Sequence, residues 1–163
     1  MALTQRITLP LLGLGLAVGA GLYASGGASP EPVASAGSAG TVVVYKSPTC
    51  GCCSSWEEHL REHGYEVDSR PSADMASVKA ELGVPAELAS CHTAVVDGYV
   101  LEGHVPAEAI DRLLAEAPDA HGLYVPGMPV GSPGMEVPSG ETEPFDVVLV
   151  DAQGDRSTWL AVR

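Results

Sequence analysis

Cysteines are the residues of this 163-residue chain that are most able to do chemistry, and three of its four fall in the string CGCC at 50–53. Cys50 and Cys53 have the C-x-x-C spacing of a redox motif. The fourth cysteine, Cys91, is followed directly by His92. A thiolate is both a nucleophile and a metal ligand, so the sequence predicts thiol redox chemistry or the binding of a soft metal ion.

Three interpretations of these thiols stay open at the level of the sequence. Two structural disulfides are a common meaning of an even cysteine count in an exported protein, although the adjacent Cys52 and Cys53 would each need a distant partner. A thiol–disulfide oxidoreductase or isomerase would use Cys50 and Cys53 as attacking and resolving thiols. Against that interpretation, Cys52 stands where thioredoxins carry proline. A metal site would gather several thiolates and imidazoles, with copper or zinc as the ion.

Two methionines favour copper over zinc. Met128 and Met135 lie in turns rich in glycine and proline, where a methionine has few neighbours for packing. A thioether is a ligand for Cu(I), whereas zinc prefers thiolate, imidazole and carboxylate. The alternative is that both methionines cover an apolar edge of a sheet. Two further histidines are candidate imidazole donors: His59, about two helical turns after Cys52, and His104.

Short β-branched runs alternate with helical patterns along the rest of the chain, and 118–144 is rich in turn residues. The expected strands are 41–45, 65–68, 93–96, 99–105, 145–150 and 157–162. The expected helices are 52–63, 73–82 and one that begins at Pro106. This order predicts an α/β, thioredoxin-like fold: a central mixed sheet flanked by helices, with a long Gly/Pro/Met loop and a C-terminal hairpin.

In such a fold the CGCC string lies at the N-terminus of the first helix. Unpaired N–H groups and the helix dipole favour thiolate over thiol there. The helical spacing puts Cys52 on the same face as Trp56 and Leu60. The loop that carries Cys91 is expected to face this helix start, so that Cys91 joins the other three cysteines.

The N-terminal 36 residues have the layout of an export signal. One positive charge in 1–6 precedes an uncharged, apolar stretch over 7–30, and Ala-Ser-Ala at 34–36 offers a cleavage site. An uncleaved membrane anchor is the alternative, because the uncharged run approaches the roughly 20 residues that span a bilayer. We expect a signal peptide and leader over 1–36, a flexible linker over 37–40 and one domain over 41–163, located in the periplasm. The membrane would be a partner only through an uncleaved N-terminal segment.

The charge of the chain excludes one class of partner. Eight Lys and Arg against 21 Asp and Glu give a net charge of −13, and the basic residues do not cluster. Phosphate binding depends on clustered Lys and Arg, so no nucleic-acid partner is expected.

Three long strings carry a family resemblance: YKSPTCGCCSSWEEHL (45–60), SCHTAVVDGYVLEGHVP (90–106) and GLYVPGMPVGSPGME (122–136). They closely resemble the CopG-like family of exported bacterial proteins, long labelled a domain of unknown function and associated with copper resistance. The resemblance spans nearly all of the chain from Thr41 to about Trp159. It implies a thioredoxin-like fold, copper binding by clustered thiols and interconversion of Cu(I) and Cu(II), while it leaves enzymatic turnover open.

Carried over by matching position, the resemblance implies a set of metal ligands in this chain. The first four are Cys50, Cys52, Cys53 and Cys91, with His59, His92, His104, Met128 and Met135 as secondary candidates. Adjacent cysteines suit a multinuclear copper cluster better than one tetrahedral site. We therefore expect an exported protein that captures copper for resistance, with copper ions and other periplasmic copper-handling proteins as partners. The alternative is a periplasmic thiol–disulfide oxidoreductase or isomerase that uses Cys50 and Cys53.

Overall fold

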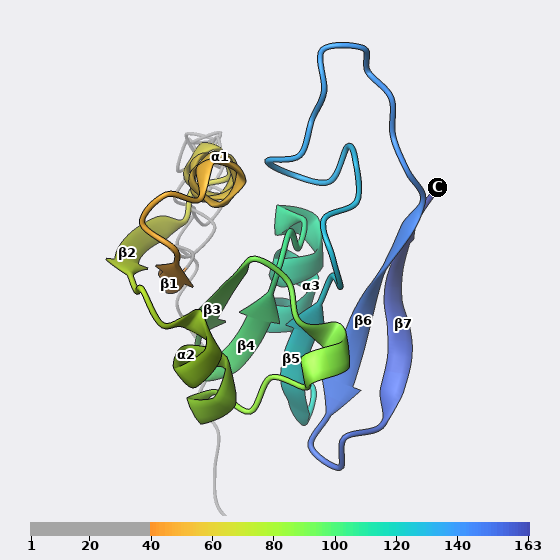
Figure 1. Ribbon diagram of the computed structural model, residues 1–163. Helices are drawn as coiled ribbons and strands as arrows, with labels where there is room; N and C mark the ends of the chain where they lie inside the picture. The colour runs from red at the N-terminus through yellow and green to blue at the C-terminus, as the bar shows by residue number, and fades with distance from the viewer. Residues whose placement is uncertain (1–39) are drawn as a thin grey trace, which may run out of the picture. The chain divides into compact units, whose positions relative to one another are not determined.

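The computed structural model describes residues 40–163 (Figure 1). The predicted signal peptide or anchor at 1–36 and all but the last residue of the predicted linker at 37–40 lie outside the described residues. Within residues 40–163, none of the helices has the length and apolar character needed to cross a membrane.

One mixed sheet of seven strands organises the domain, in the order β2-β1-β3-β4-β5-β6-β7. β1 runs parallel to β2 and antiparallel to β3, and β4 runs parallel to β5, while the other neighbours are antiparallel. The strands are β1 (Thr41–Lys46), β2 (Glu66–Pro71), β3 (His92–Val96), β4 (Tyr99–Glu102), β5 (Ala120–Tyr124), β6 (Phe145–Asp151) and β7 (Arg156–Val162). The helices are α1 (Gly51–Glu62), α2 (Met75–Glu81), the 3-10 helix η1 (Ala86–Leu88) and α3 (Ala107–Glu116).

The central strands of this sheet are buried on both sides, because helices cover both of its faces. Leu101 and Leu123 pack in the main core with the buried side chains of α1 and α3. Their chain neighbours Val100 and Tyr124 point to the opposite face, where they form a smaller cluster with Leu88 of η1. Figure 1 shows α2 and η1 in front of the sheet, on this second face.

The predicted α/β class, the central mixed sheet with flanking helices, the long loop and the C-terminal hairpin are confirmed. The finer assignment as thioredoxin-like stays a prediction. One strand was missed: the predicted loop over 118–144 contains β5, so the irregular segment is 125–144. The string AHGLY lacks Val, Ile and Thr, and its pairing is set by tertiary contact, since a side chain at Gly122 would collide with the backbone of Val100.

The predicted strand 99–105 is also shorter than expected. β4 ends at Glu102 because Gly103 has a φ of +75°, a left-handed conformation that a strand does not continue through. The backbone turn at Gly103 takes His104 out of the sheet. That change of direction matters for the site described next.

Candidate metal centre

The first helix presents two cysteines in different ways. The turn before α1 is closed by a hydrogen bond from the Cys50 N–H to the carbonyl of Ser47, and Cys50 then occupies the N-cap of the helix. Cys53 is fully buried on the face of Trp56 and Leu60, whereas Cys52 is half-buried. Cys52 lies four residues before Trp56 and so on the same side of the helix, as predicted, but it stands at the edge of the buried stripe, which is fully buried only from Cys53 on.

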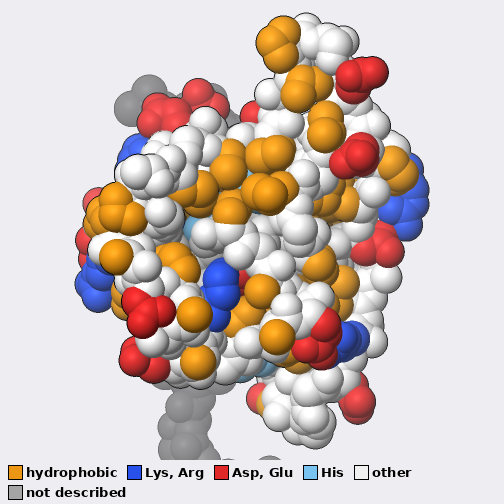
Figure 2. Space-filling view, viewed as in Figure 1, with side chains coloured by type: hydrophobic (Ala, Val, Ile, Leu, Met, Phe, Trp, Pro, Cys, Tyr) orange, Lys and Arg blue, Asp and Glu red, His pale blue; other side chains and the backbone are white. Residues whose placement is uncertain are grey.

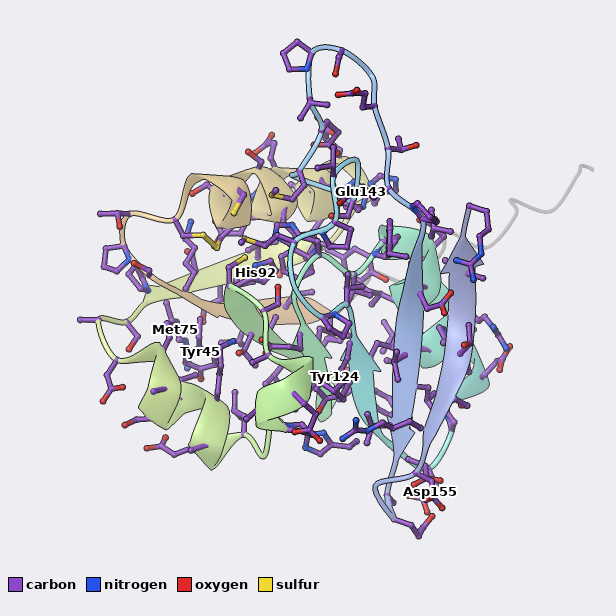
Figure 3. All side chains as sticks on the ribbon, turned by 45° about the vertical axis from the view of Figure 1, so that its right-hand side comes forward. Tyr45, Met75, His92, Tyr124, Glu143 and Asp155 are labelled. Carbon is purple, nitrogen blue, oxygen red and sulfur yellow. A yellow bond between two sulfur atoms is a disulfide. The ribbon has the colours of Figure 1, made fainter. Side chains whose placement is uncertain are left out.

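Cys50 and Cys53 are joined by a disulfide, and Cys52 and Cys91 are free thiols. The antiparallel pairing of β1 with β3 sets Lys46 opposite His92, so Cys91 lies next to the turn that leads into α1. The Cys52 Sγ lies 3.6 Å from the Cys50 Sγ and 3.8 Å from the Cys91 Sγ. All four sulfur atoms lie within 4.8 Å of one another. The structure thus brings the fourth cysteine to the other three, and Figure 3 shows the yellow sulfur atoms gathered between the start of α1 and His92.

Two imidazoles extend this cluster. Cys91, His92 and His104 form a second group of donor atoms within 4.8 Å of one another, so Cys91 belongs to both groups. The Cys91 Sγ lies 3.1 Å from the His104 Nε2 and 3.4 Å from the His92 Nδ1. The His104 Nδ1 donates to the carbonyl of Pro133 at 2.8 Å, which leaves Nε2 unprotonated and aimed at the sulfur. His92 Nε2 is a buried nitrogen without a hydrogen-bond partner among residues 40–163.

Burial keeps both imidazoles neutral. The pKa of His92 is lowered well below its usual value by burial, by His104 and by Lys79, and burial also lowers the pKa of His104. The Trp56 ring lies 4.4 Å from the His92 ring, and its Nε1 donates to the Val105 carbonyl at 2.8 Å. A neutral imidazole is the form that binds metals, so these side chains are suited to be ligands.

The thiol of Cys91 holds its proton in the metal-free protein. Burial, together with the neighbouring Cys52, raises the pKa of Cys91 to about 12. Only the thiolate binds a metal ion, so metal binding at this sulfur must release a proton.

The long loop at 125–144 contacts both segments that carry cysteines. Ser90 Oγ donates to the carbonyl of Gly127, and Gly134 packs so closely on α1 that an added Cβ would lie 2.7 Å from the Cys52 carbonyl oxygen. Met128 and Met135 each follow one of these two glycines. Met128 is 52% exposed, so it does not cover an apolar sheet edge, and Met135 is half-buried. Figure 2 shows hydrophobic side chains, in orange, gathered where α1 and this loop approach each other.

His59 is the candidate ligand that the structure places apart from the others. Among the described residues it belongs to neither group of donor atoms. Its Nε2 accepts a hydrogen bond from the Ala107 N–H at 3.2 Å, at the first residue of α3. Burial and the neighbouring His63 lower the pKa of His59, which keeps this nitrogen free to accept. Trp56 and His59 thus hold the segment just after His104 from the α1 side.

Sequence reasoning missed two buried ion pairs beneath the site. Glu102 is fully buried and accepts from Lys79 at 2.5 Å, from the Ser90 N–H at 2.5 Å and from Thr93 Oγ1 at 2.7 Å. The bond to the Ser90 N–H fixes the residue before Cys91. A charged residue in a strand usually lies at a solvent-exposed position, so no signal in the sequence could have revealed the burial of Glu102.

The second buried pair lies under α1. Lys46 contacts Glu57 at 3.2 Å and Ser54 at 2.6 Å, and Glu57 also accepts from Ser69 at 2.6 Å. These contacts tie the end of β1 to the helix that carries Cys52. A buried ion pair is costly in desolvation, so we interpret both pairs as devices that fix the geometry of the two cysteine-bearing segments.

Comparison with known proteins places the chain in a family. Residues 88–135 match a family model described as protein of unknown function, DUF411. Two solved structures described as copper resistance protein CopG, form 2 and form 1, are each 43% identical to this chain. Form 2 has a TM-score of 0.73, and the match covers 76% of this chain and 98% of that chain. Form 1 has a TM-score of 0.71, and the match covers 75% of this chain and 96% of that chain. The chain belongs to the CopG-like family. No curated protein matches it.

The family and the cysteine cluster together assign a copper-related role, as the three sequence strings predicted. The matched segment 88–135 contains Cys91, His92, His104, Met128 and Met135. The CGCC string lies outside that segment. The structure places this string next to Cys91, as the sequence predicted.

The hydrogen bond of His59 leads to a test of its role. We expect His59→Ala to lower the Cu(I) affinity about tenfold, the usual effect of losing a group that orients a ligand, because the segment after His104 loses an anchor. His59→Gln keeps an acceptor for the Ala107 N–H and should stay close to the unmodified protein. Competitive Cu(I) titration measures both. The control is His121→Ala, a histidine of β5 that belongs to neither group of donor atoms and does not contact His59. Equal losses in the Gln and Ala variants, with a changed copper spectrum, would show that the imidazole is itself a ligand.

A second test concerns the contact between the loop and α1. Gly134 has a φ of +82°, and a Cβ there would lie 2.7 Å from the backbone of both Cys52 and Trp56. Gly134→Ala should displace Pro133, the acceptor for His104, and weaken Cu(I) binding about tenfold. Gly140→Ala is the matched control, because its φ is +73° but nothing lies within 4 Å of the added carbon. Both variants should lose about 1 kcal/mol of stability from left-handed strain, and Gly134→Ala should lose more because its Cβ also meets the backbone of α1. If both bind copper equally, the loop does not support the site.

Proposed function

We propose that this chain is an exported copper-binding protein that captures Cu(I) through clustered thiolates and so contributes to copper resistance. The observation that carries the proposal is the convergence of four sulfur atoms within 4.8 Å, with one of them shared by two neutral imidazoles. Thiolate and imidazole together favour copper over the hard cations, and family membership favours copper over zinc. The charge pattern of the leader supports export to the periplasm.

The spacing of the sulfur atoms supports more than one copper ion. Two thiolates on one tetrahedral metal, with bonds of about 2.3 Å, lie about 3.8 Å apart. The Cys52 sulfur has two neighbours at this kind of distance, Cys50 at 3.6 Å and Cys91 at 3.8 Å. In the reduced protein Cys52 is therefore placed to bridge two ions. We propose that His104 completes the Cys91 side of the cluster, with His92, Met128 and Met135 as additional ligands.

Redox state would gate this site. The disulfide between Cys50 and Cys53 removes two of the four thiolates, so oxidation of this pair lowers the number of ions that can be held. Electrons from the same pair could reduce Cu(II) to Cu(I). Capture and redox interconversion would then use the same sulfur atoms.

A thiol–disulfide oxidoreductase is the second candidate, because the disulfide itself favours it. Cys50 is half-buried at a helix N-cap, and Cys53 is buried behind it, which is the arrangement of an attacking and a resolving thiol. Metal-free protein that reduces insulin disulfides with turnover, and loses this activity in Cys50→Ser, would establish this function in place of copper capture.

Metal analysis of the reduced protein tests the copper proposal. Protein reduced and loaded with Cu(I) under anaerobic conditions should retain more than one copper per chain after removal of excess metal. Cys91→Ser should lose most of this copper, because it removes the sulfur that joins the two donor groups, whereas His63→Ala should retain it. Inductively coupled plasma mass spectrometry measures the copper per chain, and thiol titration measures the free cysteines per chain. A single copper ion per reduced chain contradicts the cluster. A reduced chain that retains no copper contradicts the proposed function as a whole.

A further inference from the structure

Cys52 and Cys91 are the two cysteines that remain when Cys50 and Cys53 are joined, and their sulfur atoms lie 3.8 Å apart. Both are half-buried, so small oxidants reach them. We propose that Cys52 and Cys91 form a second disulfide, which makes the four cysteines a store of four electrons. The part of this inference that concerns copper rests on the proposed function, whereas the disulfide itself does not.

The choice of partner follows from the positions of the sulfur atoms. The chain has four cysteines, and Cys52 is a poor partner for the adjacent Cys53. Its other close neighbour, Cys50, is already bonded to Cys53. Cys91 is therefore the partner left for Cys52. Closure requires the two sulfur atoms to move from 3.8 Å to the bonded distance of about 2.05 Å.

The structure holds Cys91 in place for this closure. The buried carboxylate of Glu102 fixes the Ser90 N–H, and Ser90 Oγ is bonded to the carbonyl of Gly127. Cys52 lies in the first turn of α1, which Lys46 anchors through Ser54 and Glu57. Each sulfur thus belongs to a segment that is tied to the body of the domain by buried polar contacts. The pair is positioned by the fold and does not depend on a chance encounter of two mobile loops.

Cupric ions are the oxidant in the proposed step. Each thiol loses one proton and one electron, two S–H bonds break, one S–S bond forms, and two Cu(II) ions become two Cu(I) ions. The two protons pass to water. The pair Cys50 and Cys53 reacts with the same balance, so a fully reduced chain converts four Cu(II) ions.

The two steps have different consequences for the metal. Closing Cys50 and Cys53 leaves Cys52, Cys91 and His104 as donors. Closing the second pair removes every thiolate of the chain, because all four cysteines are then bonded. The second disulfide would therefore release the Cu(I) that the first one leaves bound.

The test counts electrons and maps disulfides. Fully reduced protein is titrated with Cu(II) in the presence of an excess of a chromogenic chelator that is specific for Cu(I). The product is then alkylated, digested and analysed by mass spectrometry. The unmodified chain should yield four Cu(I) ions and a cross-linked peptide pair that joins Cys52 to Cys91. Cys91→Ser and Cys52→Ser should each yield two. The double variant Cys50→Ser/Cys53→Ser should also yield two, with the Cys52–Cys91 cross-link as its one disulfide.

A copper-free arm separates this inference from the proposed function and needs no variant. The thiol oxidant diamide should close the same cross-link in the unmodified chain. If Cys52 and Cys91 are both alkylated after treatment with diamide and with Cu(II), the second disulfide is overturned, whether or not the protein binds copper. If diamide closes the pair but no Cu(I) is produced, the disulfide stands and the copper step is overturned.

Discussion

The pairing of β1 with β3 is the contact on which the site depends. Lys46 lies opposite His92 at the end of this ladder, and the turns that carry the two cysteine segments leave the sheet at that point. A shift of register by one residue would turn His92 to the other face of the sheet and move Cys91 away from α1. The buried contacts of Lys46 with Glu57 and of Lys79 with Glu102 secure the two segments on either side. The cluster is thus a consequence of strand register, reinforced by ion pairs whose desolvation is costly.

Burial then determines the chemistry that these donors can do. Neutral imidazoles at His92 and His104 and a protonated thiol at Cys91 mean that the metal-free site carries little charge, and a soft cation enters by displacing a thiol proton. Trp56 and the backbone of Pro133 and Gly134 enclose the imidazole side of the cluster. The Cys52 side stays half-open, which is where an ion or an oxidant can approach.

Much of the fold and of the cysteine cluster could be predicted from the sequence because the signals were local. The β-branched run at 41–45, the glycine after the first helix and the Asp-Gly turn at 97–98 act over a few residues. β5 could not be predicted, since its string has a weak strand propensity and is held by pairing with β4 and β6. The bond of His59 to α3 and the burial of Glu102 likewise depend on neighbours that are distant in sequence.

Copper K-edge X-ray absorption of the reduced, Cu(I)-loaded protein tests the central claim most directly, because it reports the atoms around the metal. We predict a first shell dominated by sulfur with some nitrogen, and a short copper–copper distance that disappears in Cys91→Ser. A first shell of nitrogen and oxygen alone, or a sulfur shell without any copper–copper contribution at full loading, would contradict a thiolate-bridged cluster built from both cysteine segments.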